Sequence, residues 1–248
     1  STTAIADYQW PLVLPMAMPG YIVAYTYVDL LSYAGPVQTW LRGLFGWKTP
    51  ADYWFPEIRS MGGAIIVLSM VLYPYVFLTA RASFIRQPGM QMEVARALGQ
   101  TAWGAFRRVA LPLARPAIAV GVSLALMECV NDIGAAGFFG VRTLTLGIYT
   151  TWLSQGNLGG AAQIAAVMLV FVFALLWIER AARRQRSFVM PTRRPRAADR
   201  VRLRGIRGWI AFAVCLIPII VGFIVPALTL VNFALHHLDQ AVSSSFFK

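Results

Sequence analysis

The sequence predicts an all-α polytopic membrane protein, and three observations lead to this fold class. Of the 248 residues, 58% are hydrophobic and 13% are charged, whereas a soluble domain carries about 25% charged residues. The apolar residues gather in blocks close to the ~20 residues that one helix needs to cross a bilayer. A membrane β-barrel would instead show ~10-residue segments of alternating hydrophobicity, and the sequence contains no such pattern.

Five apolar stretches are the predicted membrane spans. They cover about residues 11–33, 61–80, 116–133, 161–178 and 209–233. The third starts at Pro116, and the first, second and fifth contain proline further inside, which membrane helices tolerate where neighbouring groups satisfy the freed carbonyls. Between the third and fourth spans the chain is rich in glycine and only moderately apolar. This segment predicts a short re-entrant or interfacial helix around 144–154.

The arginine distribution sets the expected orientation. Loop 81–115 contains six arginines, and stretch 179–208 contains eleven arginines against Glu179 and Asp199. Cytoplasmic loops of membrane proteins are enriched in Lys and Arg. Two spans separate these loops, so both are expected in the cytoplasm and segments 34–60 and 134–160 outside. A nucleic-acid-binding tract is the other interpretation of such a basic run, but its position between two spans disfavours it.

The loop between the second and third spans carries the most specific motif. Residues 93–116 read EVARALGQTAWGAFRRVALPLARP. A helix-forming segment precedes Gly99, which permits a sharp turn. An apolar stripe follows at three- and four-residue spacing: Trp103, Phe106, Val109 and Ala110. Pro112 and Pro116 are expected to end this second helix. The stripe either enters the groove of a partner protein or packs against neighbouring membrane helices.

This loop resembles the EAA loop found in permease subunits of binding-protein-dependent ABC importers. The residues that match the family pattern at its spacing are Glu93, Ala95, Gly99, Leu111 and Pro112. Val94 and Leu98 depart from it mildly. The resemblance implies a type I ABC importer transmembrane domain whose loop seats in a cleft of a nucleotide-binding subunit. Glu93 would then contact the ATPase, Gly99 would supply the turn, and Phe106 would pack in the cleft.

The same resemblance implies the partners. The chain has no G-x-x-x-x-G-K-[ST] phosphate-binding pattern, so we expect a transport subunit that is not itself an enzyme and binds no cofactor. Separate cytoplasmic subunits, two of them, would use the ATP. A periplasmic substrate-binding protein would deliver the cargo to this multi-pass protein of the bacterial inner membrane. No nucleic-acid partner is expected.

Further runs resemble ferric-iron transport permeases, namely 12–42, 127–149 and the region of 161–163. Such permeases fuse two halves in one chain. The resemblance therefore implies a first half at 1–178 with its coupling loop at 88–116, an Arg-rich cytoplasmic linker at 179–208, and the first span of a truncated second half at 209–248. On this interpretation the chain is a fragment. Ferric iron is the expected cargo, and another cargo such as thiamine is the alternative within the same class.

Four polar residues near the expected outer ends of spans are candidates for the substrate pathway. Glu128 and Asp132 are four residues apart and would share one helix face, with Asn131 beside them; Asp29 lies near the outer end of the first span. Acidic groups are costly in lipid, so a patch that attracts cations is one interpretation. An interfacial cluster satisfied by backbone groups or water is the other. No metal site is expected in the chain.

Two other classes of function were weighed against the importer. A secondary transporter driven by an ion gradient would be expected to hold an ion site near the midplane, and no charged pair lies at mid-span in the sequence. A membrane-embedded enzyme would need a motif such as H-E-x-x-H or G-x-S-x-G, and neither pattern occurs.

Overall fold

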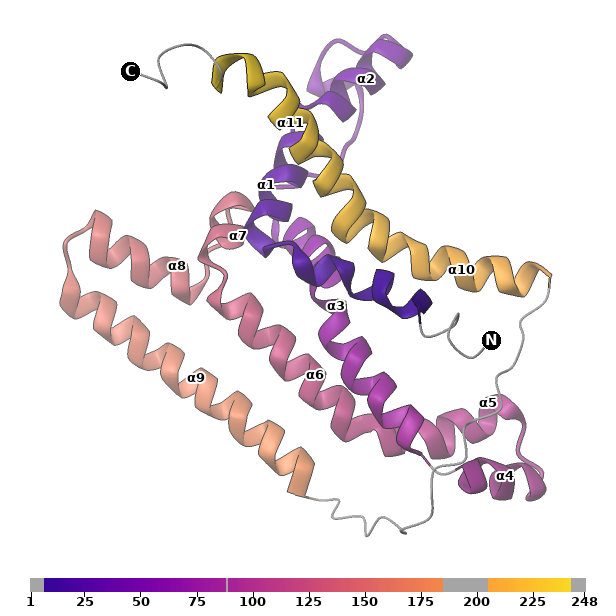
Figure 1. The fold of residues 1–248 in the computed structure, drawn as a ribbon. Coiled ribbons are helices and arrows are strands. Elements are labelled where there is room, and N and C mark those ends of the chain that lie inside the picture. The colour runs from indigo at the N-terminus through magenta and orange to yellow at the C-terminus, as the bar shows by residue number, and fades with distance from the viewer. Residues whose placement is uncertain (1–6, 88, 185–204, 242–248) are drawn as a thin grey trace. The chain divides into compact units, whose positions relative to one another are not determined.

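The computed structural model describes residues 7–87, 89–184 and 205–241, and within these ranges the chain is helical without strands (Figure 1). Most of the Arg-rich linker predicted at 179–208 lies outside the described residues. The helices are η1 (Asp7–Ala17), α1 (Gly20–Leu31), α2 (Pro36–Phe45), η2 (Pro50–Asp52), α3 (Met61–Arg86), α4 (Gly89–Ala97), α5 (Ala102–Ala105), η3 (Phe106–Ala110), α6 (Leu111–Asn131), α7 (Ile133–Phe138), α8 (Leu144–Tyr149), η4 (Thr150–Ser154), α9 (Leu158–Arg184), α10 (Ile206–Ile219), η5 (Ile220–Ile224) and α11 (Val225–Ala241).

Four helical stretches among the described residues are long and apolar enough to cross a membrane. They are Met61–Arg86, Ala102–Asn131, Leu158–Ile178 and Gly208–His236. They correspond to the second to fifth predicted spans, because uninterrupted apolar length is the signal that sequence carries best. The helix predicted around 144–154 is also present, as α8 followed directly by η4.

The first predicted span, 11–33, is wrong as a single helix. The chain bends by 84° between Trp10–Ala17 and Gly20–Phe45, so this region is a broken span or a re-entrant loop. Pro19 stands at the break with an extended ψ of 136°. A proline has no N–H to donate and disfavours helical geometry in the residue before it, which accounts for the break at this point.

The chain divides into two compact units, each described here by itself. Unit 1 comprises Ser1–Val71, Asp132–Leu146 and Trp209–Lys248; unit 2 comprises Leu72–Asn131 and Gly147–Gly208. The boundaries between the units fall within α3, α8 and α10 and between α6 and α7.

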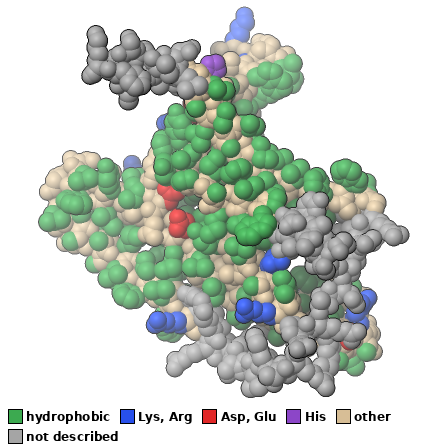
Figure 2. Space-filling view, in the orientation of Figure 1, with side chains coloured by type: hydrophobic (Ala, Val, Ile, Leu, Met, Phe, Trp, Pro, Cys, Tyr) green, Lys and Arg blue, Asp and Glu red, His purple; other side chains and the backbone are tan. Residues whose placement is uncertain are grey.

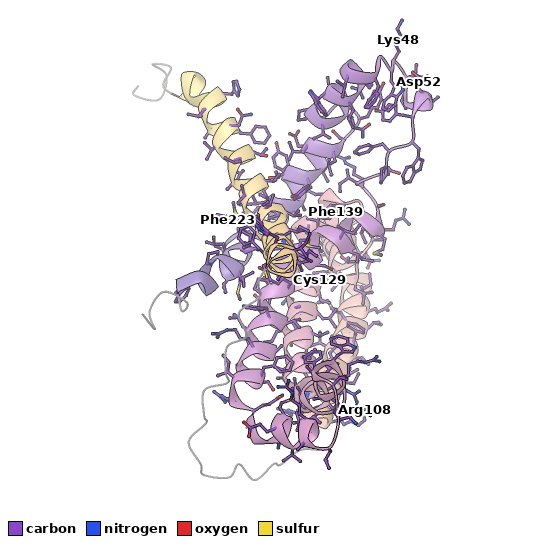
Figure 3. The ribbon with its side chains drawn as sticks, turned by 90° about the vertical axis from the view of Figure 1, so that its right-hand side faces the viewer. Lys48, Asp52, Arg108, Cys129, Phe139 and Phe223 are labelled. Carbon is purple, nitrogen blue, oxygen red and sulfur yellow. The ribbon has the colours of Figure 1, made fainter. Side chains whose placement is uncertain are left out.

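The core of unit 1 forms where α1 and α7 pack closely. Its buried side chains include Val23, Ala24, Ala135 and Phe139, and Figure 3 labels Phe139. Gly134 allows this approach, because a Cβ there would lie 2.6 Å from the Cβ of Tyr21. Small residues at such a crossing bring two helix backbones together.

The C-terminal helices belong to this same unit. The Tyr27 hydroxyl donates a hydrogen bond of 2.7 Å to the carbonyl of Val221 in η5. A Cβ on Gly222 would lie 2.5 Å from the Met70 carbonyl oxygen and 2.8 Å from the Cβ of Pro15. The segment predicted as the start of a second half therefore packs on helices of the first.

Unit 2 is built on the crossing of α3 and α6, with α9 packed on α6. A Cβ on Gly121 would lie 2.7 Å from the Val76 Cα and 2.8 Å from the Tyr75 carbonyl oxygen, and it would overlap the Thr79 hydroxyl. The two helices are antiparallel and touch backbone to backbone at this glycine, so its missing side chain sets how closely they approach.

The segment predicted to face outward, 34–60, is held by side-chain hydrogen bonds within unit 1. Gln38 donates through Nε2 to the Leu31 carbonyl at 2.8 Å and accepts from the Tyr53 hydroxyl at 2.6 Å. Arg42 donates to the Tyr33 carbonyl at 2.8 Å. Carbonyl groups left free at the end of α1 are thus satisfied by side chains of α2.

Candidate functional site

The loop between α3 and α6, which belongs to unit 2, folds as two short helices joined by a tight turn. The N–H of Gly99 bonds the Arg96 carbonyl at 3.0 Å, and the N–H of Gln100 bonds the Ala95 carbonyl at 3.1 Å. This pair of bonds is a Schellman motif, which satisfies the last carbonyls of a helix and places one residue in the left-handed region. Gly99 is that residue, with φ of +83°. The sharp turn predicted at Gly99 is confirmed.

A capped helix and a wide turn follow. The Thr101 hydroxyl accepts a hydrogen bond of 3.1 Å from the N–H of Gly104 and so caps α5, as threonine does at helix starts. The helix then widens into η3, a π-turn in which the N–H of Leu111 bonds the Phe106 carbonyl. Such turns insert one residue into an α-helix and are frequent at functional sites.

The predicted helix stop at Pro112 and Pro116 is wrong. The helix continues through both prolines, and Ala102–Asn131 forms one uninterrupted apolar stretch. Pro112 stands directly after the wide turn of η3, and each proline removes only one backbone donor. A long apolar helix tolerates these losses. The second helix of the loop and the third span are therefore one continuous element.

Aromatic contacts hold this loop against the end of α3. Phe106 is half-buried, and its ring stacks on Phe84 at 5.9 Å and on Trp103 at 5.4 Å between centroids. Gln87 adds a hydrogen bond of 3.0 Å from Nε2 to the Ala110 carbonyl. For Phe106 the structure thus shows the intramolecular packing that the sequence left open, and its entry into a partner's cleft stays a prediction.

Three large apolar side chains of the loop are nevertheless mostly exposed. The exposed fraction is 51% for Val94, 78% for Leu98 and 66% for Trp103. Glu93 is exposed beside them, whereas Ala95 is buried. Sequence reasoning treated Val94 and Leu98 only as departures from the family pattern. Their four-residue spacing, which places both on one helix face, is the signal that identifies them.

The four candidate pathway residues are divided between the two units. Glu128 and Asn131 are exposed on α6 in unit 2, whereas Asp132 and Asp29 are half-buried in unit 1. The expectation that Glu128 and Asp132 share a face of one helix is wrong, because α6 ends at Asn131 and Asp132 has non-helical dihedrals of −83° and 84°.

Asp132 instead caps the next helix. Its Oδ1 accepts a hydrogen bond of 2.8 Å from the N–H of Ala135, and its Oδ2 lies where a Cβ on Gly20 would be. Aspartate is a favoured N-cap because its oxygen satisfies a free N–H of the first turn. This contact with the backbone matches the second of the two interpretations given for the acidic residues. Among the described residues, no group of three or more His, Cys, Asp or Glu side chains could hold a metal ion.

Comparison with known proteins assigns the chain to a family. The model of the family described as "Binding-protein-dependent transport system inner membrane component" matches residues 8–187. The chain belongs to this family. The matched residues include the whole loop from α4 to the start of α6, and they form an all-helical type I ABC importer domain.

Three relatives illustrate the range within the family. The chain is 32% identical over 171 residues to a probable molybdenum ABC transporter permease protein of Haloferax volcanii, a match that covers 68% of this chain and 57% of the relative. It is 27% identical to a putative 2-aminoethylphosphonate transport system permease protein of Salmonella typhimurium, covering 67% and 58%. It is 28% identical to a sulfate transport system permease protein of Escherichia coli, covering 68% and 62%.

These relatives bear on two predictions made from the sequence. The membership of a binding-protein-dependent permease family is confirmed. The ferric-iron cargo gains no support, because none of the three relatives is named for iron. The chain also spans less than two thirds of the length of these relatives.

Proposed function

We propose that this chain is the membrane-spanning subunit of an ATP-driven importer and that the loop from α4 to η3 docks onto a cytoplasmic ATP-hydrolysing subunit. The observation that carries the proposal is the exposed apolar surface formed by Val94, Leu98 and Trp103 on a preformed turn. Apolar anchors on short helices are what a partner groove takes up in helix-in-groove recognition.

The residues around these exposed side chains give the loop a fixed backbone, which favours docking. The Schellman turn at Gly99, the Thr101 cap and the stack of Phe106 on Phe84 fix the backbone before any partner arrives. A preformed surface loses little conformational entropy on binding. Because η3 continues into α6 without a break, a displacement of the docked loop would move the membrane helix with it.

The test compares Trp103→Ala with a matched control, Trp152→Ala, which removes a tryptophan that is 53% exposed in η4 on the expected outer side. Truncating a buried tryptophan anchor costs about 2 kcal/mol or more, which corresponds to roughly 30-fold weaker binding. We expect Trp103→Ala to weaken binding of the cognate ATP-hydrolysing subunit by that factor in a titration with the purified permease. Unchanged binding by Trp103→Ala, or an equal loss in Trp152→Ala, would refute docking through this surface.

A second pair separates docking from folding of the loop. Phe106→Ala should lower the unfolding temperature of the permease, because the ring is packed between Phe84 and Trp103. Trp103→Ala should leave it nearly unchanged, because that ring is mostly exposed. If both variants destabilise the isolated permease equally, the effect of Trp103 on binding reports folding and the docking proposal loses its support.

For the cargo we propose a small oxyanion. Two of the relatives are named for sulfate and 2-aminoethylphosphonate, and the third for molybdenum. Within this chain, the Asp132 carboxylate is engaged at the start of α7, which removes one of the two carboxylates proposed to attract a cation. Ferric iron is the second candidate, and the observation that favours it is the exposed carboxylate of Glu128 on an apolar helix.

Glu128→Gln distinguishes the two cargoes, because a carboxylate attracts cations and repels anions. Uptake would be measured with the full-length permease and its cognate subunits, using labelled sulfate, molybdate, 2-aminoethylphosphonate and ferric iron. For an oxyanion we expect uptake that is unchanged or increased in Glu128→Gln. Uptake of iron by the natural protein, reduced in the variant, would overturn the oxyanion proposal in favour of the metal.

A further inference from the structure

Unit 2 carries arginines that have no partner among the described residues. The side chains of Arg81, Arg86 and Arg115 make no hydrogen bond or ion pair to a described residue. Arg42 in unit 1 is the opposite case: it donates to Tyr33, Tyr53 and Thr39 and lies 4.2 Å over the Tyr33 ring. From residue 81 to residue 127 the sequence contains six arginines and a single carboxylate, Glu93. The described residues therefore do not neutralise the charge of this region.

The antiparallel pairing of α3 and α6 puts these arginines into one narrow band. Gln87 contacts Ala110, and Gly121 packs against Val76 and Thr79, so residue numbers on the two helices run in opposite directions past these contacts. Arg81 and Arg115 then differ in height by less than one helical turn, ~5.4 Å. Arg86 lies about 7.5 Å further towards the coupling loop, at 1.5 Å per residue.

Exposed apolar side chains adjoin the arginines on both helices. On α3, Leu78 and Ile85 are 40% and 56% exposed and share a helix face with Arg81, at spacings of three and four residues. On α6, Val122 is 41% exposed and stands seven residues after Arg115, on the same face. Figure 2 shows Lys and Arg side chains near this end of unit 2, next to hydrophobic surface.

We propose that Arg81 and Arg115 bind the headgroup phosphate of an anionic phospholipid. The arginine side chains are complementary to a phosphate group, and the exposed apolar side chains next to them are complementary to acyl chains. A phospholipid carries both. Lipid tails would cover Leu78 and Val122, and the arginine side chains would reach the headgroup by extending towards the interface. The expected cytoplasmic location of loop 81–115 places the band at the leaflet that carries negative surface charge.

The position of the band favours lipid over the ATP-hydrolysing partner. Arg81 and Arg115 lie on the two long apolar helices, Met61–Arg86 and Ala102–Asn131, rather than on α4. The arginines near the exposed anchors of the loop are Arg96 and Arg108 instead. Figure 3 labels Arg108, whose Nη1 donates to Gln100 Oε1 at 3.0 Å.

The experiment is a lipid titration of the purified full chain in detergent, followed by native mass spectrometry. The probes are phosphatidylglycerol and phosphatidylcholine with identical acyl chains, and inorganic phosphate as a third arm. We expect tighter binding of phosphatidylglycerol than of phosphatidylcholine. In Arg81→Gln/Arg115→Gln this preference should fall by about fivefold for each arginine removed, ~25-fold in total.

Two comparison variants make the result specific. Arg59→Gln/Arg142→Gln removes the same charge from exposed arginines in the segments expected outside and should keep the preference. Arg81→Lys/Arg115→Lys keeps the charge and should retain most of it. Equal binding of both lipids by the natural chain, an equal loss in the outer control, or competition by inorganic phosphate at the same concentration as lipid would overturn the proposal. A normal lipid preference in Arg81→Gln/Arg115→Gln with weakened ATPase binding would reassign the band to the partner protein.

Discussion

The side chain of Asp132 lies at two helix starts in unit 1, those of α7 and α1. One carboxylate oxygen accepts the N–H of Ala135 in α7, and the other lies against Gly20, the first residue of α1. Both contacts occur where the backbone N–H groups of a helix start are free and the helix dipole is positive. The sequence showed that a carboxylate stands near the end of a span, but not that the helix ends one residue before it.

Asp132→Ala and Asp132→Asn separate the cap from the charge. Loss of an N-cap costs about 1 kcal/mol, whereas asparagine caps nearly as well as aspartate. We therefore expect Asp132→Ala to lower the free energy of unfolding by about that amount and Asp132→Asn by much less, measured by denaturation of the purified permease. Transport measured in parallel tests the pathway role predicted from the sequence. A loss of uptake in Asp132→Asn, with stability preserved, would assign a role to the charge itself.

Asp52, in the segment between α2 and α3, gives a prediction for pH. Hydrogen bonds from the backbone N–H groups of Thr49 and Lys48 and from the Thr49 side chain hold its pKa below the ordinary value of 3.8. Both backbone bonds are 2.8 Å long to Oδ2, and Figure 3 labels Lys48 and Asp52 at this turn. Because the folded pKa is depressed, the stabilisation is present above the unfolded value and is lost as the pH falls through the folded value.

The measurement is the amide exchange protection of Lys48 and Thr49 as a function of pH. Protection should be constant at neutral pH and fall as the pH drops below 3.8. Asp52→Asn, which cannot ionise, should show no such change over the same interval. Protection that falls equally in both proteins would show that another group controls the turn.

At the scale of the element, the crossing of α3 and α6 depends on the absence of one side chain. A Cβ on Gly121 would meet backbone atoms of Tyr75 and Val76, and backbone cannot rotate away as a side chain can. Gly121→Ala should therefore destabilise the protein by about 1–3 kcal/mol, as overpacking does in other interiors. The matched control is Gly137→Ala in α7, where a Cβ would meet nothing within 4 Å.

In the control the extra methyl group should be neutral or stabilise by about 0.5–1 kcal/mol, because alanine favours helix over glycine. Thermal unfolding of the two variants in the same detergent gives the comparison. A Gly121→Ala protein as stable as the control would mean that the helices can separate at no cost, contrary to the close contact described.

The sequence predicted the positions of the long helices better than the places where helices break. The length of the apolar stretches located α3, α6, α9 and the last span, because that length does not depend on how the helices pack. The break at Pro19 and the passage through Pro112 were both missed, although each involves proline in an apolar stretch. The two prolines differ in the backbone around them. Pro19 precedes the first residue of α1 and has an extended ψ, whereas Pro112 follows the π-turn of η3 inside a continuous helix. Residue identity alone does not encode that difference.

The candidate loop was predicted better than the candidate pathway. Gly99 could be located because a positive φ has few solutions other than glycine. The partner of Phe106 could not, because Phe84 lies more than twenty residues earlier in the chain and no local pattern links the two rings. Glu128 and Asp132 were paired by helical spacing, which fails once a helix ends between them.

At the scale of the whole molecule, contacts distant in sequence hold the ends of the described chain together within unit 1. Tyr27 and Val221 are 194 positions apart and share one hydrogen bond. Tyr27→Phe keeps the ring and removes the bond, which should cost about 1 kcal/mol. Tyr25→Phe is the matched control, because the ring of Tyr25 contacts Phe138 and Phe233 and no hydrogen bond of its hydroxyl is described.

The comparison is made by hydrogen exchange of amides in η5 and α11. We expect faster exchange there in Tyr27→Phe and natural rates in Tyr25→Phe. Natural rates in both would indicate that apolar packing at Gly222 alone retains the last helices on this unit.

The wide turn at η3 also sets the direction in which the side chains of α6 point around the helix axis. An α-helix turns by ~100° per residue, and a π-turn adds one residue, so every side chain of α6 faces about 100° away from where an uninterrupted α-helix starting at Thr101 would put it. Deleting one residue between Phe106 and Ala110 would restore α-helical winding there while leaving the sequence of α6 unchanged. Gly121 would then leave its contact with α3, and the span would be out of register with the loop that is proposed to drive it.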